Sequence, residues 1–331
     1  MSFLPPGVQS GNLAGFPQVA YERAPILAWY ANTPFLAQGC DMRPMPKRVG
    51  RVNQFYGTRP FVAATSTLTE GIPGPSLSLS QVTSTVFMAE YGDWIGISNV
   101  ANDMFISPVV IDATRDLGYR GALTANATAS SQFDATATSD STARVDLLDN
   151  EYVISNTFRR AETSLVNNNV PGRESGLYTT FISPLQSYDV FADNSSGGAV
   201  DTLKRSQGGA TELKDGIVRN YQILEWAGCR IIRTTTVPTY SNYPSTGKTG
   251  YGLFVCGKEA MLASELQGVM APRDPNYKVR VKPLTDIDLS NPMLQTAAIV
   301  SYDYFLGVTP RPNTNGTAGF RRIRSETSMT Q

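Results

Sequence analysis

The stretch from Leu68 to Ser98, LTEGIPGPSLSLSQVTSTVFMAEYGDWIGIS, carries the strongest signal for the fold. It opens with a glycine- and proline-rich turn at Glu70–Pro75 and continues into a run of β-branched and aromatic residues. Such residues favour strands, and clusters of glycine and proline bound them. Together with the residues before the turn, the pattern predicts a long β-hairpin over residues 48–98, with strands at about 51–67 and 77–98.

Two interpretations of this hairpin are open. A long two-stranded hairpin is only marginally stable alone in water, and its edges invite pairing with other strands. The hairpin therefore packs on its own domain, or it lies on a neighbouring copy of the chain.

Charge is segregated along this part of the chain. Basic residues cluster before and at the start of the hairpin: Arg43, Lys47, Arg48, Arg51 and Arg59. From Pro60 through Thr114 there is no Lys or Arg, whereas acidic residues are present: Glu70, Glu90, Asp93, Asp103 and Asp112. Such polarity either steers one copy onto another or is neutralised within the subunit. On the first interpretation we expect the assembly contacts to be Arg48, Arg51, Arg59, Glu70, Glu90, Asp93 and Trp94.

The chain outside the hairpin predicts an α+β fold. Residues 1–47 contain seven prolines and are expected to form an extended arm, with an apolar anchor at Pro34–Ala37. A helix is expected to begin at Ser107-Pro108, a good cap followed by a first-turn proline. Its pattern weakens past Ala122, so residues 124–144 are interpreted as an insertion or a distorted helix end.

The second half of the chain predicts a helix and several strands. Apolar residues from Leu147 to Leu165 recur every three or four positions and stop at Asn167, which predicts a helix over this span. The other expected elements are strands at about 177–182, 221–226, 229–236, 253–256, 277–282, 296–306 and 320–323, and short helices at 184–191 and 259–266. Residues 193–216 are expected to be a polar loop.

Composition narrows the function. The chain has 331 residues and 41% hydrophobic residues, enough for a substantial core, but only 17% charged residues against a usual ~25%. A surface poor in charge suggests that other protein covers it. The net charge of zero argues against a sequence-specific nucleic-acid binder. No apolar run approaches the ~18 residues of a membrane helix, and the N-terminus does not resemble a secretory signal.

The chain contains no histidine, which removes the commonest general base and most zinc sites. Its three cysteines, Cys40, Cys229 and Cys256, are far apart and are expected to be free thiols. We therefore assign no catalytic, cofactor-binding or metal-ligating residue.

Three short motifs were weighed. Ser245–Thr249 ends like a phosphate-binding loop, but Asn242 replaces its first glycine and a strand follows, so a surface turn is predicted. Asp286 and Asp288 lack further acidic ligands nearby, which favours a polar turn over a cation site. A basic cluster near the C-terminus has three open interpretations: contact with DNA phosphates, a solvated tail, or an inter-subunit salt bridge. It consists of Arg321, Arg322 and Arg324.

The order of these segments resembles the Hong Kong 97 fold of tailed-phage major capsid proteins, and within it the branch of N-four-like podoviruses. The stretches that carry the resemblance are Leu68–Pro73, Val82–Thr85, Tyr91–Ser98, Val145–Pro171, Tyr178–Pro184, Gly228–Thr234 and Leu253–Ala260. Gln222 and Leu224 depart from the Glu and Gly expected before Trp226. A cross-link between subunits is not carried over, because no Lys lies between Arg59 and Arg115.

The resemblance implies an organisation. It comprises an N-terminal arm (1–47), an extended hairpin or E-loop (48–98), a peripheral domain with a spine helix (99–140), an axial domain (141–275), and return strands of the peripheral domain (276–331). It implies a major capsid protein that forms hexamers and pentamers of an icosahedral head around double-stranded DNA.

The resemblance also implies partners. These are other copies of the chain, portal, scaffolding and cement proteins, and packaged DNA through non-specific contacts, with no membrane and no cofactor. The expected location is the virion, after assembly in the bacterial cytoplasm. Rival interpretations are an encapsulin-like shell protein, a decoration or tail protein of the virion, and a hydrolase that uses carboxylates or serine.

Overall fold

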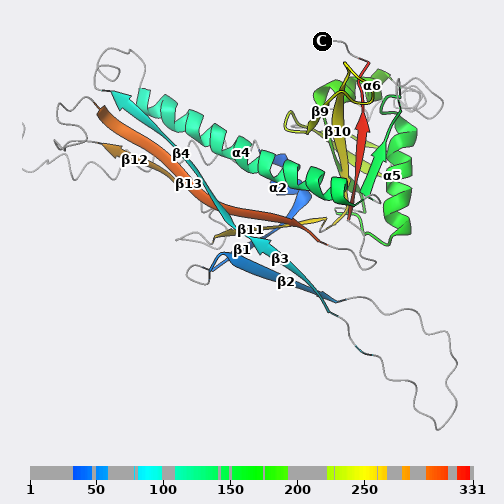
Figure 1. Ribbon diagram of the computed structural model, residues 1–331, viewed down its shortest axis with the longest axis horizontal. Helices are drawn as coiled ribbons and strands as arrows, with labels where there is room; N and C mark the ends of the chain where they lie inside the picture. Colours follow the sequence, from blue (N-terminus) through cyan, green and yellow to red (C-terminus); the bar gives the residue numbers. More distant parts are fainter. Residues whose placement is uncertain are drawn as a thin grey trace, which may run out of the picture.

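The computed structural model describes part of the chain and divides it into an elongated sheet, a hairpin and a lobe (Figure 1). The described residues are 33–46, 50–58, 78, 81–98, 109–140, 143–148, 151–173, 176–192, 222–226, 228–258, 260–266, 278–283, 296–311 and 319–328.

The elongated sheet is built around one long strand. Its members are β1 (Cys40–Met45), β4 (Ala89–Ser98), β11 (Met261–Leu266), β12 (Lys278–Pro283) and β13 (Thr296–Pro310). β13 pairs antiparallel with β4 on one side, and with β12 and then β11 on the other. β1 joins β11 in parallel. The sheet thus combines strands from both ends of the chain.

Helix α4 (Val109–Ser139) covers one face of this sheet and runs on to the lobe (Figure 1). The expectation that residues 124–144 would be an insertion or a distorted end is wrong for the part up to Ser139. Buried residues, four alanines and one phenylalanine, continue the helical spacing: Ala122, Ala125, Ala129, Phe133 and Ala137. The Thr124 and Thr128 hydroxyls donate to carbonyl oxygens four residues earlier, which satisfies these polar groups within the helix.

The hairpin consists of β2 (Val52–Thr58) and β3 (Gln81–Phe87), paired antiparallel. The predicted second strand, 77–98, is in fact two strands. The amide of Met88 still donates to the Arg51 carbonyl, at 2.9 Å, and the chain then leaves the hairpin to enter the elongated sheet as β4. The predicted tip lies outside the described residues.

Strand β11 replaces the short helix predicted at 259–266. Apolar and polar residues do not alternate in Met261–Ser264, because both faces of this strand are buried. Met261 and Ala263 belong to the core that contains α4, whereas Leu262 contacts Phe55 and Val86 of the hairpin. Pairing with β1 and β13 on both edges overrides the weak local preference.

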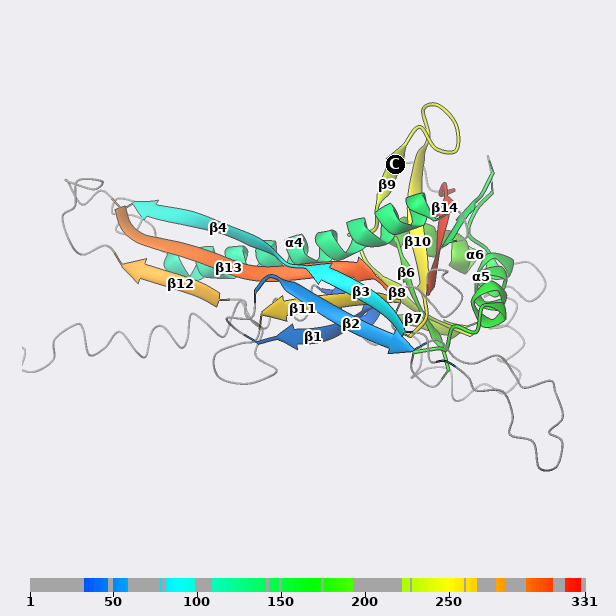
Figure 2. The same cartoon turned by 60° about the horizontal axis from the view of Figure 1, so that its bottom comes forward.

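The lobe is a seven-stranded sheet between two layers of helices (Figure 2). Its strands are β5 (Arg144–Asp146), β6 (Tyr178–Ile182), β7 (Gln222–Trp226), β8 (Cys229–Arg233), β9 (Thr239–Ser241), β10 (Thr249–Cys256) and β14 (Phe320–Ser325). Leu253 and Val255 of β10 pack under α5 (Ser155–Asn167) and α6 (Pro184–Ala192). Phe254 and Cys256 point to the opposite face, toward α4.

Helix α5 begins eight residues later than the periodicity predicted. The amide of Leu147 donates to the Arg324 carbonyl, at 3.0 Å, so residues 144–147 extend the sheet instead. The predicted end at Asn167 is confirmed, as are β6 and α6 within a residue or two.

The described part of the N-terminal arm is not irregular. Residues 34–45 form α2 (Pro34–Gly39) and then β1. Phe35, in the predicted anchor, is fully buried and stacks on Phe181, with ring centroids 4.2 Å apart. Its amide donates to Asn126 Oδ1 of α4, at 2.8 Å. The arm therefore closes the junction between the lobe and the elongated sheet.

Within the described residues, no helix combines the length and apolar character needed to span a membrane.

Candidate assembly surfaces

Beside β4, no helix or strand of the described residues covers one face of the elongated sheet. Successive residues of a strand point to opposite faces. Tyr91 stacks on Tyr304 and Ile97 packs in the core beneath α4, so Glu90 and Trp94 point the other way. Trp94 is 65% exposed, a large apolar surface to leave in water. We call this surface the open face. It consists of Glu90, Gly92, Trp94, Gly96, Ile299, Ser301, Asp303 and Phe305.

The hairpin presents a second exposed apolar surface. Val52 and Phe87 are direct cross-strand partners, and Phe87 is 72% exposed. Tyr56, four positions after Val52 on β2 and therefore on the same face, is also exposed. We call these residues, Val52, Tyr56 and Phe87, the outer hairpin face.

The inner side of the same hairpin packs on its own subunit. Phe55 and Val86 bury against Leu262, and Asn53 Nδ2 donates to Ser264 Oγ at 2.9 Å. At Gly307 a Cβ atom would lie 2.4 Å from the Phe87 carbonyl oxygen, so the hairpin crosses β13 too closely for any side chain there. The interpretation that the hairpin packs on its own domain is thus confirmed for this root, whereas the outer hairpin face has no partner among the described residues.

The seven predicted assembly residues fall into separate groups. Glu90 and Trp94 lie on the open face. Arg51 is exposed at the start of the hairpin, and its guanidinium lies 5.8 Å from the Phe305 ring centroid, next to the same face. Arg48, Arg59 and Glu70 lie outside the described residues.

Asp93 differs from its neighbours because it faces α4. Its Oδ2 lies 2.7 Å from Arg120 Nη2, and its Oδ1 accepts the Trp94 amide at 2.9 Å. For this residue the charge is neutralised within the subunit, one of the two outcomes that the charge pattern left open.

Sequence reasoning missed Val52, Tyr56 and Phe87. Val52 and Tyr56 lie on β2, which begins Val-Asn-Gln-Phe-Tyr and has apolar residues on both faces, so alternation does not separate inside from outside. The available signal was the position of an aromatic residue, Phe87, directly opposite Val52 once the strands are paired.

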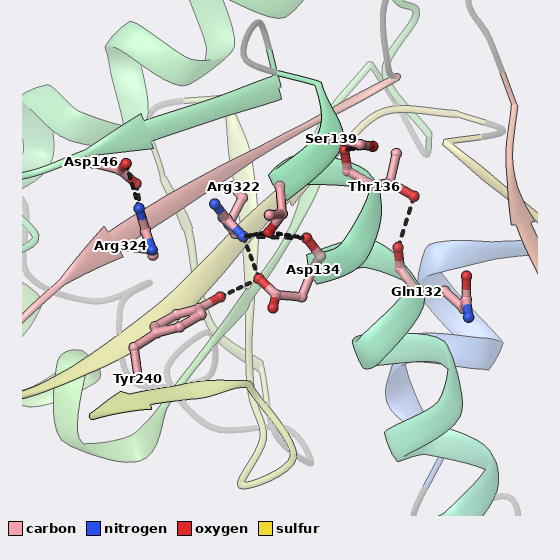
Figure 3. Close-up of polar contacts among 9 residues, drawn as sticks. Gln132, Asp134, Thr136, Ser139, Asp146, Tyr240, Arg322 and Arg324 are labelled. Carbon is pink, nitrogen blue, oxygen red and sulfur yellow. Dashed lines mark hydrogen bonds and ion pairs between the residues drawn. The ribbon is translucent and has the colours of Figure 1, made fainter. Parts of the chain in front are cut away.

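In the C-terminal basic cluster, Arg321 and Arg322 are buried and Arg324 is half-buried, and Arg322 and Arg324 are paired with carboxylates of the same chain (Figure 3), which excludes both a solvated tail and a free DNA-binding patch. Arg321 and Arg322 are 2% and 1% exposed. Arg322 Nη1 donates to the Asp134 carboxylate and, at 2.8 Å, to Thr138 Oγ1, both on α4. Arg324 forms two hydrogen bonds to Asp146, from Nε at 2.6 Å and from Nη2 at 2.5 Å.

Two tyrosines of the β9 region complete this cluster. The Tyr240 hydroxyl donates to Asp134, and the Arg324 guanidinium carbon lies 4.7 Å from the Tyr243 ring centroid. Burial raises the pKa of Tyr240 well above its usual range and that of Tyr243 to about 12, so both stay protonated donors. The hydrogen bond from Arg324 lowers the pKa of Asp146, which keeps this pair charged.

The phosphate-loop-like motif is a turn, as expected. Thr246 and Gly247 are exposed, Lys248 Nζ lies 2.8 Å from Glu326 Oε2, and strand β10 follows where a phosphate loop would open a helix. The three cysteines are free and buried, and burial raises the pKa of Cys40 and of Cys229 to about 12. Asp286 and Asp288 lie outside the described residues. Within the described ranges, no three acidic or cysteine side chains gather as a metal site.

In sequence, the chain matches neither a family model nor a curated protein. In structure it is similar to the capsid of Ralstonia phage GP4, with a TM-score of 0.69 and 10% identity over 88% of each chain. It is also similar to the capsid of the cyanophage P-SCSP1u (TM-score 0.60, 14% identity, 88% of this chain and 87% of that chain). A third is the capsid asymmetric unit of cyanophage Pam1 (TM-score 0.57, 12% identity, 90% and 93%).

The likeness covers both the elongated sheet and the lobe, because nearly nine-tenths of each chain is aligned. The α+β chain therefore has the Hong Kong 97-type capsid fold, as the order of its segments predicted.

Proposed function

We propose that the chain is the major capsid protein of a tailed phage, of the N-four-like podovirus branch. Its copies assemble into hexamers and pentamers of an icosahedral head that encloses double-stranded DNA. The observation that carries the proposal is the match over nearly the whole chain to phage capsid structures.

The exposed surfaces support self-assembly. Trp94, Tyr56 and Phe87 are between 62% and 72% exposed, and Phe87 lies directly opposite the exposed Val52. Covering such residues releases free energy in proportion to the apolar area removed from water. In a closed symmetric shell each modest contact is repeated in every subunit, so a stable particle needs no single strong contact.

We propose that the parts of the chain have the separate roles in assembly that the sequence suggested. The axial domain (141–275) forms the rings, and the hairpin (48–98) with the arm (1–47) ties neighbouring rings together. The assembly contacts are Arg48, Arg51, Arg59, Glu70, Glu90, Asp93 and Trp94, to which we add the outer hairpin face. Asp93 contributes by holding β4 against α4 through Arg120. Portal, scaffolding and cement proteins are the further partners, and DNA is held without sequence readout.

The test is to express the full chain in bacteria and to examine it by light scattering and electron microscopy. Closed shells of megadalton mass are expected. DNA-filled, tailed particles from an infected host that contain this chain would confirm its role in a phage head, whereas shells loaded with enzyme cargo would point to a compartment protein. A small monomer that turns over a substrate would overturn the proposal.

A deletion tests the role of the hairpin in shell closure. Removing residues 62–80 should leave a folded subunit, because the packed root of the hairpin (52–58 and 81–87) remains. The variant should no longer close shells. If shells of wild-type size still form, the hairpin does not tie rings together.

A further inference from the structure

Two arginines on β14 hold their carboxylates in different ways (Figure 3). Arg324 uses Nε and Nη2, the two nitrogens that form a fork matched to a carboxylate, and its partner Asp146 lies in the same sheet. Arg322 reaches Asp134 only through Nη1, and Asp134 lies on α4. One pair is locked within the lobe, and the other bridges the lobe and the long helix.

The corresponding fork of Arg322, formed by its Nε and Nη2, is buried but holds no carboxylate. Among the described residues, neither Nε nor Nη2 of Arg322 has a hydrogen-bond partner, and the residue is 1% exposed. Buried donors without acceptors cost free energy. A small movement of α4 along β14 would bring the Asp134 carboxylate from Nη1 to the fork. Such a movement satisfies these donors and keeps the ion pair.

The rest of the contact between α4 and the lobe is mostly apolar, and one further hydrogen bond crosses it, from Asn126 Nδ2 to Thr236 Oγ1, eight residues before Asp134 on α4. Phe133 of α4 packs against Phe254 and Phe320 of the lobe, with ring centroids 5.7 and 4.9 Å apart. Apolar contacts are non-directional, so they tolerate a shift that a directional hydrogen bond does not. The ion pair is the contact at this junction in which two alternative sets of donors are available to one carboxylate.

We propose that the Arg322 junction, made of Asp134, Thr138, Tyr240 and Arg322, is an adjustable joint that gives the lobe two angles on α4. This inference rests on the proposed function. Rings of six and rings of five copies need different angles between neighbouring lobes, and one sequence must supply both. The Nη1 contact serves one ring and the fork contact serves the other.

The first test uses wild-type shells, imaged by electron cryomicroscopy at side-chain resolution. Subunits of the two ring types should differ in the angle between α4 and the lobe sheet and in the Arg322 nitrogens that face Asp134. The same contact and the same angle in both rings would overturn the joint. If the full chain forms no shells, the proposed function itself has failed, which is a separate result.

The second test is Arg322→Lys, with Arg324→Lys as the matched control on the same strand. Lysine keeps a buried positive charge paired with Asp134. It has a single ammonium group in place of two alternative sets of donors, so only one angle between the lobe and α4 remains. The variant should assemble into tubes or open sheets in place of closed shells, while Arg324→Lys still closes them. Closed shells from Arg322→Lys at the wild-type yield would contradict the joint. Thermal unfolding by circular dichroism establishes that each variant is folded, and if Arg322→Lys is unfolded, the wild-type images decide.

Discussion

The two sheets of the molecule differ in how their faces are covered. In the lobe, α5 and α6 cover one face and α4 with α2 covers the other, so every residue of β6 is buried. In the elongated sheet, α4 covers one face, and the hairpin covers the other over β11 and the part of β13 around Gly307. Trp94 is left 65% exposed on the remainder. Both faces of the lobe sheet are thus covered within one subunit, whereas we propose that another copy covers the rest of the elongated sheet.

The largest expected effect on subunit stability comes from the core of the lobe. Phe254 is fully buried among Phe35, Phe133 and Phe320. Phe254→Ala should lower the free energy of unfolding by about 3–5 kcal/mol, through lost burial and the cavity left behind. Chemical denaturation of the unassembled subunit measures this. As a control, Val52→Ala on the outer hairpin face should change the free energy of unfolding little. An equal loss in both variants would contradict the difference between the buried lobe core and the exposed hairpin.

The next effect tests the buried side of the elongated sheet. Glu265 lies on β11 beside Pro44 and Leu306, and burial raises the pKa of its carboxyl to about 7. Because the folded pKa lies above the unfolded value, the folded state binds the proton more tightly. The contribution of protonated Glu265 to the free energy of unfolding is therefore complete below about pH 4.5 and is lost as the pH rises through 7.

Glu265→Gln should therefore stabilise the subunit at pH 8, by about 2 kcal/mol, with little difference from wild type at pH 5. Chemical denaturation of both proteins between pH 5 and pH 8 tests whether the variant gains stability relative to wild type as the pH rises. A variant that is less stable than wild type at pH 8 would show that the carboxylate has a favourable partner.

A smaller effect is expected at the edge of the lobe sheet. Arg324 lowers the pKa of Asp146, so this pair stabilises the fold at neutral pH, and its contribution is lost as the pH falls below about 3.8 toward the folded pKa. Both side chains are partly exposed, so Asp146→Asn should cost only about 0.5–1 kcal/mol at pH 7. Stability measured at pH 7 and at pH 3 should show the difference shrinking at the lower pH; a constant difference would mean that packing, not charge, is lost.

The smallest effect on the subunit is expected at the open face. Trp94→Ala removes an exposed side chain, so the free energy of unfolding should change by less than about 0.5 kcal/mol. The yield of closed shells should nevertheless fall, as measured by sedimentation. Ser131→Ala, at an exposed position on α4, which covers the opposite face of the sheet, is the control that should leave assembly intact. A large loss of stability in Trp94→Ala would mean that the tryptophan serves the subunit's own core.

Much of this arrangement was predictable from local pattern. The end of α5 at Asn167, strand β6 and helix α6 follow from periodicity, capping and proline placement. The order of segments predicted the fold class, which the structural likeness confirms.

The errors share a cause, which is tertiary context. Met261–Leu266 became a strand because neighbours pair with both of its edges and cover both of its faces. α4 persists past Ala122 because alanines pack closely on a sheet, although they carry little hydrophobic signal. Arg321 and Arg322 look like a surface cluster until Asp134, about 190 residues earlier in the chain, is placed beside them. The exposed positions of the hairpin likewise follow only from its register.

We propose that another copy of the chain covers the open face and the outer hairpin face. Hydroxyl-radical footprinting of unassembled subunits and of assembled particles tests this directly. Oxidation of Trp94, Tyr56 and Phe87 should be fast in the free subunit and should fall sharply on assembly, whereas the buried Phe254 stays protected in both. If particles form and the three exposed side chains oxidise as fast as in the free subunit, these surfaces are not where the copies meet.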